Sequence, residues 1–231
     1  MSELSRVGEN KDTWYPWSIA QLESILIKVL YENRGYDHVY ALRKNIAYNL
    51  QYIEFQDKLL QDLKLSSVII TQTIKTIVLV GCGIIESLLH FLLIVNGNHT
   101  KTDWIEKAKF KGNQKKLDDE MVRIDTIIYK KLEEEQLKHM SFDAMIKCAK
   151  SKSVFGSNEN IYEKLESLRS LRNKVHLQVI NNPNDTDWNT FNNHHLSDIC
   201  KVLYAIITSS LFEVTEKEEL CFTYLRRNFV A

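Results

Sequence analysis

The sequence predicts an all-α protein, an up-and-down bundle of four to five long helices with short accessory helices. Glycine and proline are scarce, with 7 and 2 in 231 residues, whereas turn-rich β folds need many of both. Long stretches repeat apolar residues every three or four positions, which is the spacing of one helix face. The chain is 44% hydrophobic and can bury one substantial core. We therefore expect one helical bundle over residues 36–231, preceded by an N-terminal lead-in over residues 1–35.

Local signals predict a short helix in the lead-in and two long helices after it. Pro16 can begin the short helix because its missing N–H would be unpaired in the first turn anyway. Residues 37–65 then keep helical apolar spacing without a breaker, which predicts a long amphipathic helix. Ser66-Ser67 offers a hydroxyl cap for the next helix, and Asn96-Gly97 is a stop signal for it.

The second long helix is the most apolar segment in the chain, so a membrane span has to be weighed. Residues 76–95 match the roughly 20 residues that a bilayer requires, but Glu86 and His90 would each cost about 2.5 kcal/mol or more at mid-membrane depth. We expect instead a buried helix of a soluble protein, in which Gly81 and Gly83 permit close approach by a neighbour. Glu86 and His90 share a face of this helix. They form a local polar pair, or Glu86 reaches an arginine of a later helix.

Residues 101–116 are expected to form a charged connector with the best local basic patch in the sequence. Within it, Lys107, Lys109 and Lys111 are candidate substrate-binding residues, and the aromatic side chains between them offer surfaces on which RNA bases could stack. The alternative is an ordinary solvated charge run. Residues 115–140 combine charges with an apolar stripe, which predicts a mostly exposed helix on the outside of the bundle.

Three further helices complete the predicted bundle. Residues 141–143 can cap a shorter helix over residues 144–152. The next helix begins near Asn160 and ends before Pro183, because proline disfavours helical backbone at the residue before it. The last long helix is predicted over residues 191–212 from its regularly spaced leucines and isoleucines.

Charge and cysteine content narrow the classes of function. The chain has 30 basic and 30 acidic residues, so no global field attracts nucleic acid and any contact with RNA must be local. The four cysteines are widely spaced and form no Cys-x-x-Cys pair, which favours reduced thiols in the cytoplasm over disulfides or a zinc site. The polar N-terminus is unlike a secretory signal. We therefore expect a cytoplasmic protein.

Histidines near the last helix do not predict a metal site. His194 and His195 stand at its start, where a protonated imidazole would face an unfavourable dipole, so we expect both to be neutral. A metal site that joins them to His176 lacks an Asp or Glu at chelating spacing. No metal and no cofactor is therefore expected.

The stretch from residue 165 to 178 carries the strongest candidate site. At about 100° per residue, Arg169, Arg172, Asn173 and His176 fall within one polar arc of a helix, and Arg169 and His176 project almost in line, two turns apart. Such a face most often is plain solvated surface. It also has the composition of a phosphate-binding cluster.

The residue types in this cluster suit cleavage of RNA by its own 2′-hydroxyl group. An imidazole, with an ordinary pKa of about 6.5, moves protons near neutral pH, and the permanently charged guanidinium of Arg172 or Arg169 holds a phosphate. Asn173 would orient the imidazole or bind a phosphate oxygen. Tyr162, two full turns ahead of Arg169, and Glu86, which would orient either arginine, are supporting candidates. One helix supplies one imidazole, so a two-fold dimer would provide the second proton carrier.

The run Leu-Arg-Ser-Leu-Arg-Asn-Lys-Val-His, residues 168–176, resembles the signature helix of the HEPN superfamily. That motif is an Arg followed by a polar residue and, a few positions further on, a His. Six residues separate Arg169 from His176, the long end of the motif's spacing. Arg172-Asn173 is the more familiar Arg-Asn step, one residue too close to His176 for the motif. Either arginine therefore stays a candidate for the catalytic part.

This resemblance implies a fold, an activity and partners. HEPN ribonucleases are α-helical bundles that dimerise with their Arg and His motifs facing one another across a shared cleft. Many act as toxins or antiphage defence effectors in bacteria, often restrained by an antitoxin. On this resemblance we expect a homodimeric, metal-independent endoribonuclease that leaves 2′,3′-cyclic phosphate ends, with an antitoxin or a larger defence complex as a further partner and no membrane association.

Two other functions stay open. A non-catalytic HEPN-like module would hold a nucleotide, an RNA end or an acidic protein without cutting anything, and the zero net charge and the short spacing from Arg172 to His176 favour it. A helical scaffold would use the same cluster only to seal a dimer interface.

Overall fold

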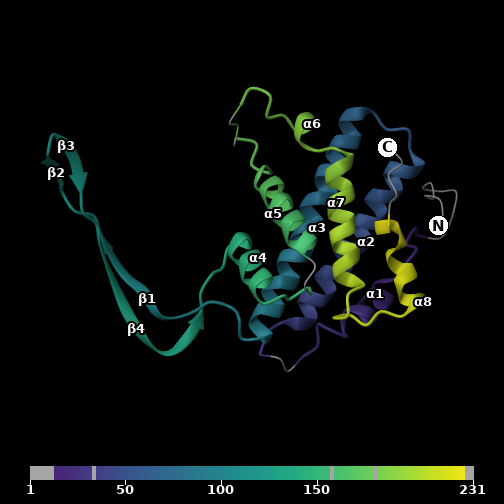
Figure 1. The fold of residues 1–231 in the computed structure, drawn as a ribbon, viewed down its shortest axis with the longest axis horizontal. Helices are drawn as coiled ribbons and strands as arrows, with labels where there is room; N and C mark the ends of the chain where they lie inside the picture. Colours follow the sequence, from purple (N-terminus) through teal and green to yellow (C-terminus); the bar gives the residue numbers. More distant parts are fainter. Residues whose placement is uncertain (1–12, 33–34, 157–158, 179, 181, 227–231) are drawn as a thin grey trace.

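The protein is a body of packed helices from which a long β ribbon projects (Figure 1). The computed structural model describes residues 13–32, 35–156, 159–178, 180 and 182–226. The predicted all-α class is therefore wrong, because four strands form two small antiparallel sheets beside the helices, which makes the fold mixed α/β. The helical body itself follows the apolar spacing of the sequence.

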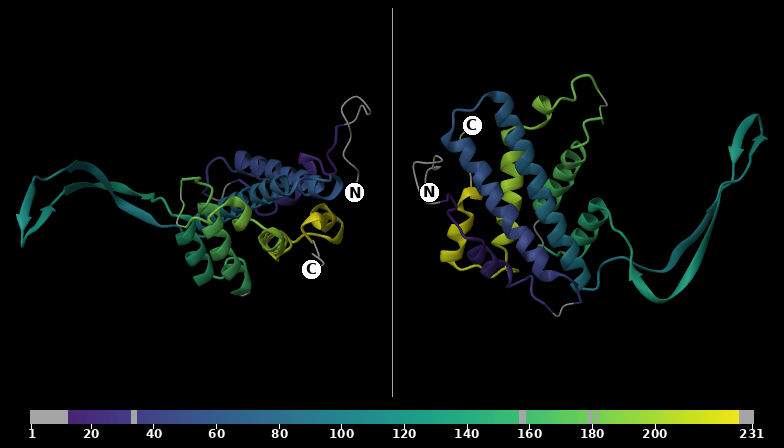
Figure 2. Two further views of the ribbon diagram at one scale, coloured as in Figure 1. Left: turned by 90° about the horizontal axis from the view of Figure 1, so that it is seen from above. Right: turned by 180° about the vertical axis from the view of Figure 1, so that it is seen from behind.

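Helices α1 (Ile19–Leu26), α2 (Val39–Asp62) and α3 (Ser67–Val95) form the first part of the body. The Ser18 hydroxyl accepts a hydrogen bond from the Gln21 N–H, and the Gln21 side chain caps Ser18 in return, which fixes the start of α1. Helices α2 and α3 lie side by side and run in opposite directions (Figure 2). The predicted long helices are thus present: α2 is a few residues shorter than the expected range 37–65, and α3 begins and ends at its predicted cap and stop signals.

Helix α3 is the central element of the core. In the part of the chain that the structure describes, it is the one helix long and apolar enough to cross a membrane, and 61% of its most apolar window is buried inside the protein. This is the burial expected of a core helix. A Cβ at Gly81 would lie 2.5 Å from Cγ1 of Ile199, so this glycine allows close contact with a neighbouring helix as predicted. At Gly83 a Cβ would meet nothing within 4 Å, and the same expectation is wrong there.

The β ribbon, which we call the arm, comprises residues 101–137. Strands β1 (Lys101–Phe110) and β4 (Thr126–Leu137) pair antiparallel over its length, with register shifts where one strand bulges. Strands β2 (Gln114–Leu117) and β3 (Glu120–Arg123) form a second hairpin at its tip. The charged connector and the exposed helix expected here are therefore wrong.

Two local signals in the arm explain this difference. Residues 107–111 alternate lysine with an apolar side chain, which is the period of a strand. Asp118 and Asp119 both have positive φ, 48° and 67°, and join β2 to β3 as a two-residue turn of the kind that hairpins prefer. At Gly112 a Cβ would lie 2.1 Å from the carbonyl oxygen of Ile124, so only glycine fits where the two hairpins meet.

The remaining helices complete the body, and all of these α-helices except the last pack against α3 (Figure 1). Ser141 caps the first of them as predicted, since its hydroxyl accepts from the Ala144 N–H. The Asn192 side chain caps the longest one by accepting from the N–H groups of His194 and His195. These helices are α4 (Phe142–Ser151), α5 (Glu159–Asn173), α6 (Asp187–Thr190), α7 (Asn193–Ile207) and α8 (Glu216–Glu219), followed by a 3-10 helix (Leu220–Arg226).

Candidate functional site

Arg172 lies in the last turn of α5 and is joined to Glu86 of α3. Its Nη2 donates a hydrogen bond to Oε2 of Glu86 at 2.9 Å. The side chains are 43% and 25% exposed, so the guanidinium keeps a large part of its surface open to a ligand. Of the partners expected for Glu86, the structure shows Arg172, and among the described residues no ion pair joins Glu86 to His90. An arginine held in this way is positioned for an anion at the end of α5.

Arg169, one turn earlier, faces a second carboxylate. Its Nε lies 3.3 Å from Oδ1 of Asp143 on α4. Asp143 also pairs with Lys147, at 2.7 Å, and these cations, Lys147 foremost and Arg169 after it, lower the pKa of the Asp143 carboxyl below its ordinary value. Both predicted arginines thus have a carboxylate partner from a neighbouring helix, and a phosphate has to compete with these carboxylates.

His176 lies beyond the end of α5 rather than on its face. The helix ends at Asn173, and the N–H groups of Lys174 and Val175 bond to the carbonyls three residues earlier, a tightening common in last turns. His176 follows in a turn and its side chain is exposed, as is that of Asn173. The expected helical alignment of Arg169 with His176 is therefore wrong, although the exposure of His176 leaves it open to a substrate.

Tyr162 is a buried structural residue. Its hydroxyl accepts a hydrogen bond from the Phe155 N–H at 2.9 Å and lies 3.3 Å from the Gly156 carbonyl oxygen, to which it donates. Burial raises the pKa of this phenol. These bonds hold the turn between α4 and α5, so the structure gives Tyr162 a structural position at the start of α5.

The predicted substrate lysines lie apart from this cluster. Lys107 and Lys109 are on β1 and Lys111 follows it, all three exposed on the arm. The arm extends away from α5 in each view (Figures 1 and 2). The structure therefore does not bring these lysines together with Arg172 in one chain.

A cavity of about 370 Å³ adjoins Glu86 and was not predicted from the sequence. Its histidines are His90 of α3 and His139, which follows the arm. Burial, and then the nearby His99 and His139, lower the pKa of His90, which favours its neutral form. Neutral imidazole can accept a proton, so His90 is a possible base. It lines the same cavity as Glu86, which is bonded to Arg172. The lining residues are Gly83, Glu86, Ser87, His90, His139, Met140 and Met145.

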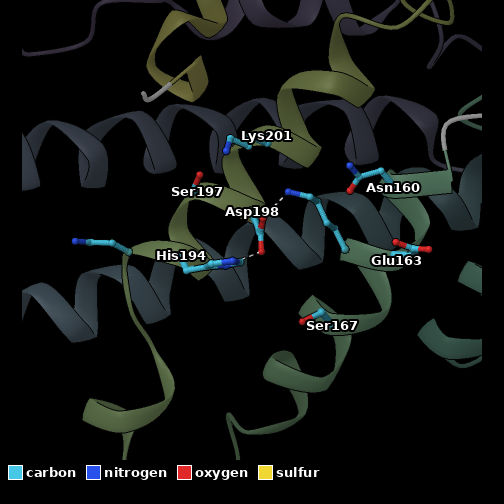
Figure 3. Close-up of a pocket in the computed structure, with 9 residues that line it drawn as sticks. Asn160, Glu163, Ser167, His194, Ser197, Asp198 and Lys201 are labelled. Atoms are coloured by element: carbon cyan, nitrogen blue, oxygen red, sulfur yellow. Dashed lines mark hydrogen bonds and ion pairs between the residues drawn. The ribbon is translucent and has the colours of Figure 1, made fainter. Parts of the chain in front are cut away.

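A second cavity, of about 540 Å³, lies between α5 and α7, and every residue that lines it carries a polar or charged group (Figure 3). Asp198 is its central residue: Lys164 Nζ lies 2.6 Å from Oδ1 and His194 Nδ1 lies 2.9 Å from Oδ2. The other lining residues are Asn160, Glu163, Ser167, Asn193, Ser197 and Lys201. None of the predicted catalytic residues borders this cavity. Helical spacing within α5 and α7 could have placed these side chains on one face each, but not opposite one another.

Metal chemistry finds no support in the described residues, in which no group of three His, Cys, Asp or Glu side chains is placed to hold an ion. Comparisons with protein-family models, with characterised proteins and with solved structures give no match for this chain.

Proposed function

We propose that this protein is a metal-independent endoribonuclease with an HEPN-like Arg and His site. The observation that carries the proposal is the Glu86–Arg172 hydrogen bond, which holds a partly exposed guanidinium at the end of α5, four residues before the exposed His176 in the chain. The resemblance of residues 168–176 to the HEPN motif supports the same assignment. On this proposal Arg172 takes the phosphate-binding part and Arg169 is secondary.

The proposed reaction needs a proton acceptor, a proton donor and a cation. The RNA 2′-oxygen attacks the adjacent phosphorus while an imidazole takes the hydroxyl proton. The bond from phosphorus to the 5′-oxygen breaks, and a second imidazole protonates that oxygen, which leaves a 2′,3′-cyclic phosphate and a 5′-hydroxyl. Arg172 stabilises the extra negative charge on the phosphate. His176 of each chain of a homodimer would supply the two imidazoles, and an antitoxin or defence complex would be a further partner.

A non-catalytic binding module is the second candidate. Both arginines are already paired with carboxylates, and His176 lies outside the helix that carries them. Such a site could hold an RNA end or a nucleotide by exchange of a carboxylate for a phosphate without the geometry for proton transfer.

One experiment separates these functions. The purified full chain is incubated with end-labelled single-stranded RNA in excess chelator, beside His176→Ala and, as a matched control, His194→Ala, which removes another exposed histidine. We expect cyclic phosphate products from the wild type and the control, and a loss of about 100-fold or more in His176→Ala. Binding without cutting that depends on Arg172 would support the module, and RNA cleavage that is unchanged in His176→Ala would contradict the proposed nuclease site.

A further inference from the structure

The arm packs against itself rather than against the helices. Most side chains of its four strands are exposed, and the ribbon stands clear of the body in every view (Figures 1 and 2). A two-stranded ribbon is at best marginally stable in water, since it needs further strands or a covering surface. The exposed large apolar side chains on the arm are Trp104, Ile105, Phe110, Leu117, Met121, Ile124, Ile127, Ile128, Tyr129 and Leu137.

Apolar side chains occupy both faces of the ribbon. Phe110 lies opposite Thr126, which places it on the same face as Ile128, two residues further along the partner strand. Trp104 lies opposite Lys131, on the other face together with Tyr129. Neither face is the polar, solvated face of an ordinary two-layer sheet. Exposed apolar side chains on both faces favour an interaction surface over an ordinary solvated sheet.

Charge along the arm is polarised. The half next to the body, residues 101–106 and 130–137, carries five carboxylates and three ammonium groups, a net charge of −2. The outer half, residues 107–127, carries six cations and four carboxylates, a net charge of +2. The arm as a whole is neutral, and its carboxylates would repel a phosphate backbone, so this distribution does not favour a nucleic acid.

A polarised, neutral arm is complementary to a second copy of itself. In a two-fold arrangement the same surface meets itself in reverse, so the basic outer half of one arm lies against the acidic inner half of the other, twice. We infer that two copies of this chain associate through their arms, packed side by side in opposite directions, and that this covers apolar surface exposed in one copy. This contact is separate from the one that would bring two His176 side chains together, because arms that run in opposite directions place the two helical bodies at opposite ends of the pair. The inference therefore goes beyond the proposed function and would hold for a chain that cuts no RNA.

Charge reversal at either end of the arm tests the inference in the full chain. The outer variant carries Lys109→Glu and Lys111→Glu, and the inner variant carries Glu133→Lys and Glu135→Lys. In each variant alone both halves of the arm have the same sign, so we expect a dimer at least about tenfold weaker than that of the wild type by sedimentation analysis. Mixed together, the two variants are complementary again, and we expect a heterodimer of wild-type affinity.

A control variant with the same change in net charge as the outer variant, Lys64→Glu with Lys152→Glu, alters exposed lysines outside the arm and should dimerise like the wild type. A wild type that is monomeric at high micromolar concentration would overturn the inference, as would single variants that dimerise normally. An outer variant that loses affinity for RNA while its dimer is unchanged would assign the arm to RNA instead. Cleavage is measured separately, so an inactive but dimeric chain would contradict only the proposed function.

Discussion

Arg172 and Glu86 join α5 to α3 across 86 residues of sequence through one charge-assisted hydrogen bond of 2.9 Å. Because both side chains are partly exposed, solvent screens the pair and its contribution to stability is at most about 1 kcal/mol. Helix α5 is held mainly by buried residues such as Leu165 and Leu168. The pair therefore matters more for where the guanidinium points than for the stability of the fold.

An exchange of the two charges separates these roles. In the double variant Glu86→Arg with Arg172→Glu, an ion pair can still join the helices, so we expect the free energy of unfolding to change by less than about 1 kcal/mol. The cation then stands on α3 and no longer at the end of α5, so RNA cleavage should fall by about 100-fold or more. Urea unfolding and cleavage of labelled RNA measure the two effects. A double variant as active as the wild type would remove Arg172 from the proposed site.

Two glycines of α3 offer a matched pair of substitutions. A methyl group at Gly81 would meet Ile199 Cγ1 at 2.5 Å, so Gly81→Ala should lower the free energy of unfolding by about 1–3 kcal/mol. At Gly83 the methyl group meets open space, and Gly83→Ala should raise stability by up to about 1 kcal/mol through helix propensity alone. Thermal unfolding of both variants measures the difference. Equal shifts in the two would contradict the close packing of α3 on α7.

Substitution of Tyr162 tests whether this residue, at the start of α5, takes part in the chemistry proposed at the end of the helix. Tyr162→Phe removes the acceptor for the buried Phe155 N–H and should destabilise the protein by about 1–3 kcal/mol. Because the hydroxyl faces the turn before α5, cleavage of RNA at a temperature where the variant is folded should match the wild type. A loss of cleavage without a loss of stability would give Tyr162 the supporting role that its position in the sequence suggests.

The sequence predicted the elements that local periodicity determines. Apolar spacing located α2, α3 and α7, and the Ser141 cap located the start of α4. The arm was missed because strand pairing depends on residues far apart in the chain: Lys101 pairs with Leu137, and the alternation around Lys109 is short. Residues 115–140 also show a helical spacing, which concealed the strands.

The helical placement of His176 in the candidate site was predicted wrongly for a related reason. Helical spacing predicted that Arg172 lies on the polar face of its helix and that Glu86 is a possible partner for it. Each of these features depends only on the face of the residue's own helix. Helical spacing could not show that α5 ends at Asn173, because a helix end depends on tertiary contacts as well as on capping residues. The contact of His139 with the cavity beside Glu86 required the arm to return to the body, which no local pattern encodes.

The free energy of unfolding should decrease as the pH rises, because of a buried carboxyl group in α2. Glu54 is 4% exposed, and burial, followed by the charge of Asp57, raises its pKa to about 8. The Glu54 charge in turn contributes to the raised pKa values of Cys221 and Tyr224, so the groups that face it are acidic or neutral. Below the ordinary pKa of about 4.5 both the folded and the unfolded chain hold the Glu54 proton. Between that value and about 8 only the folded chain holds it, and stability is lost as the pH rises through this window.

Glu54→Gln removes this titration from the folded and unfolded chain alike. We expect the wild type to lose free energy of unfolding between pH 6 and pH 8, with a slope of at most about 1.4 kcal/mol per pH unit from this group. The variant should lose less than about half as much over the same range, since its amide carries no charge to bury. Urea unfolding at both pH values measures the difference, with Glu166→Gln on the exposed side of α5 as the matched control. Parallel losses in the wild type, the control and the variant would show that Glu54 is not the group responsible.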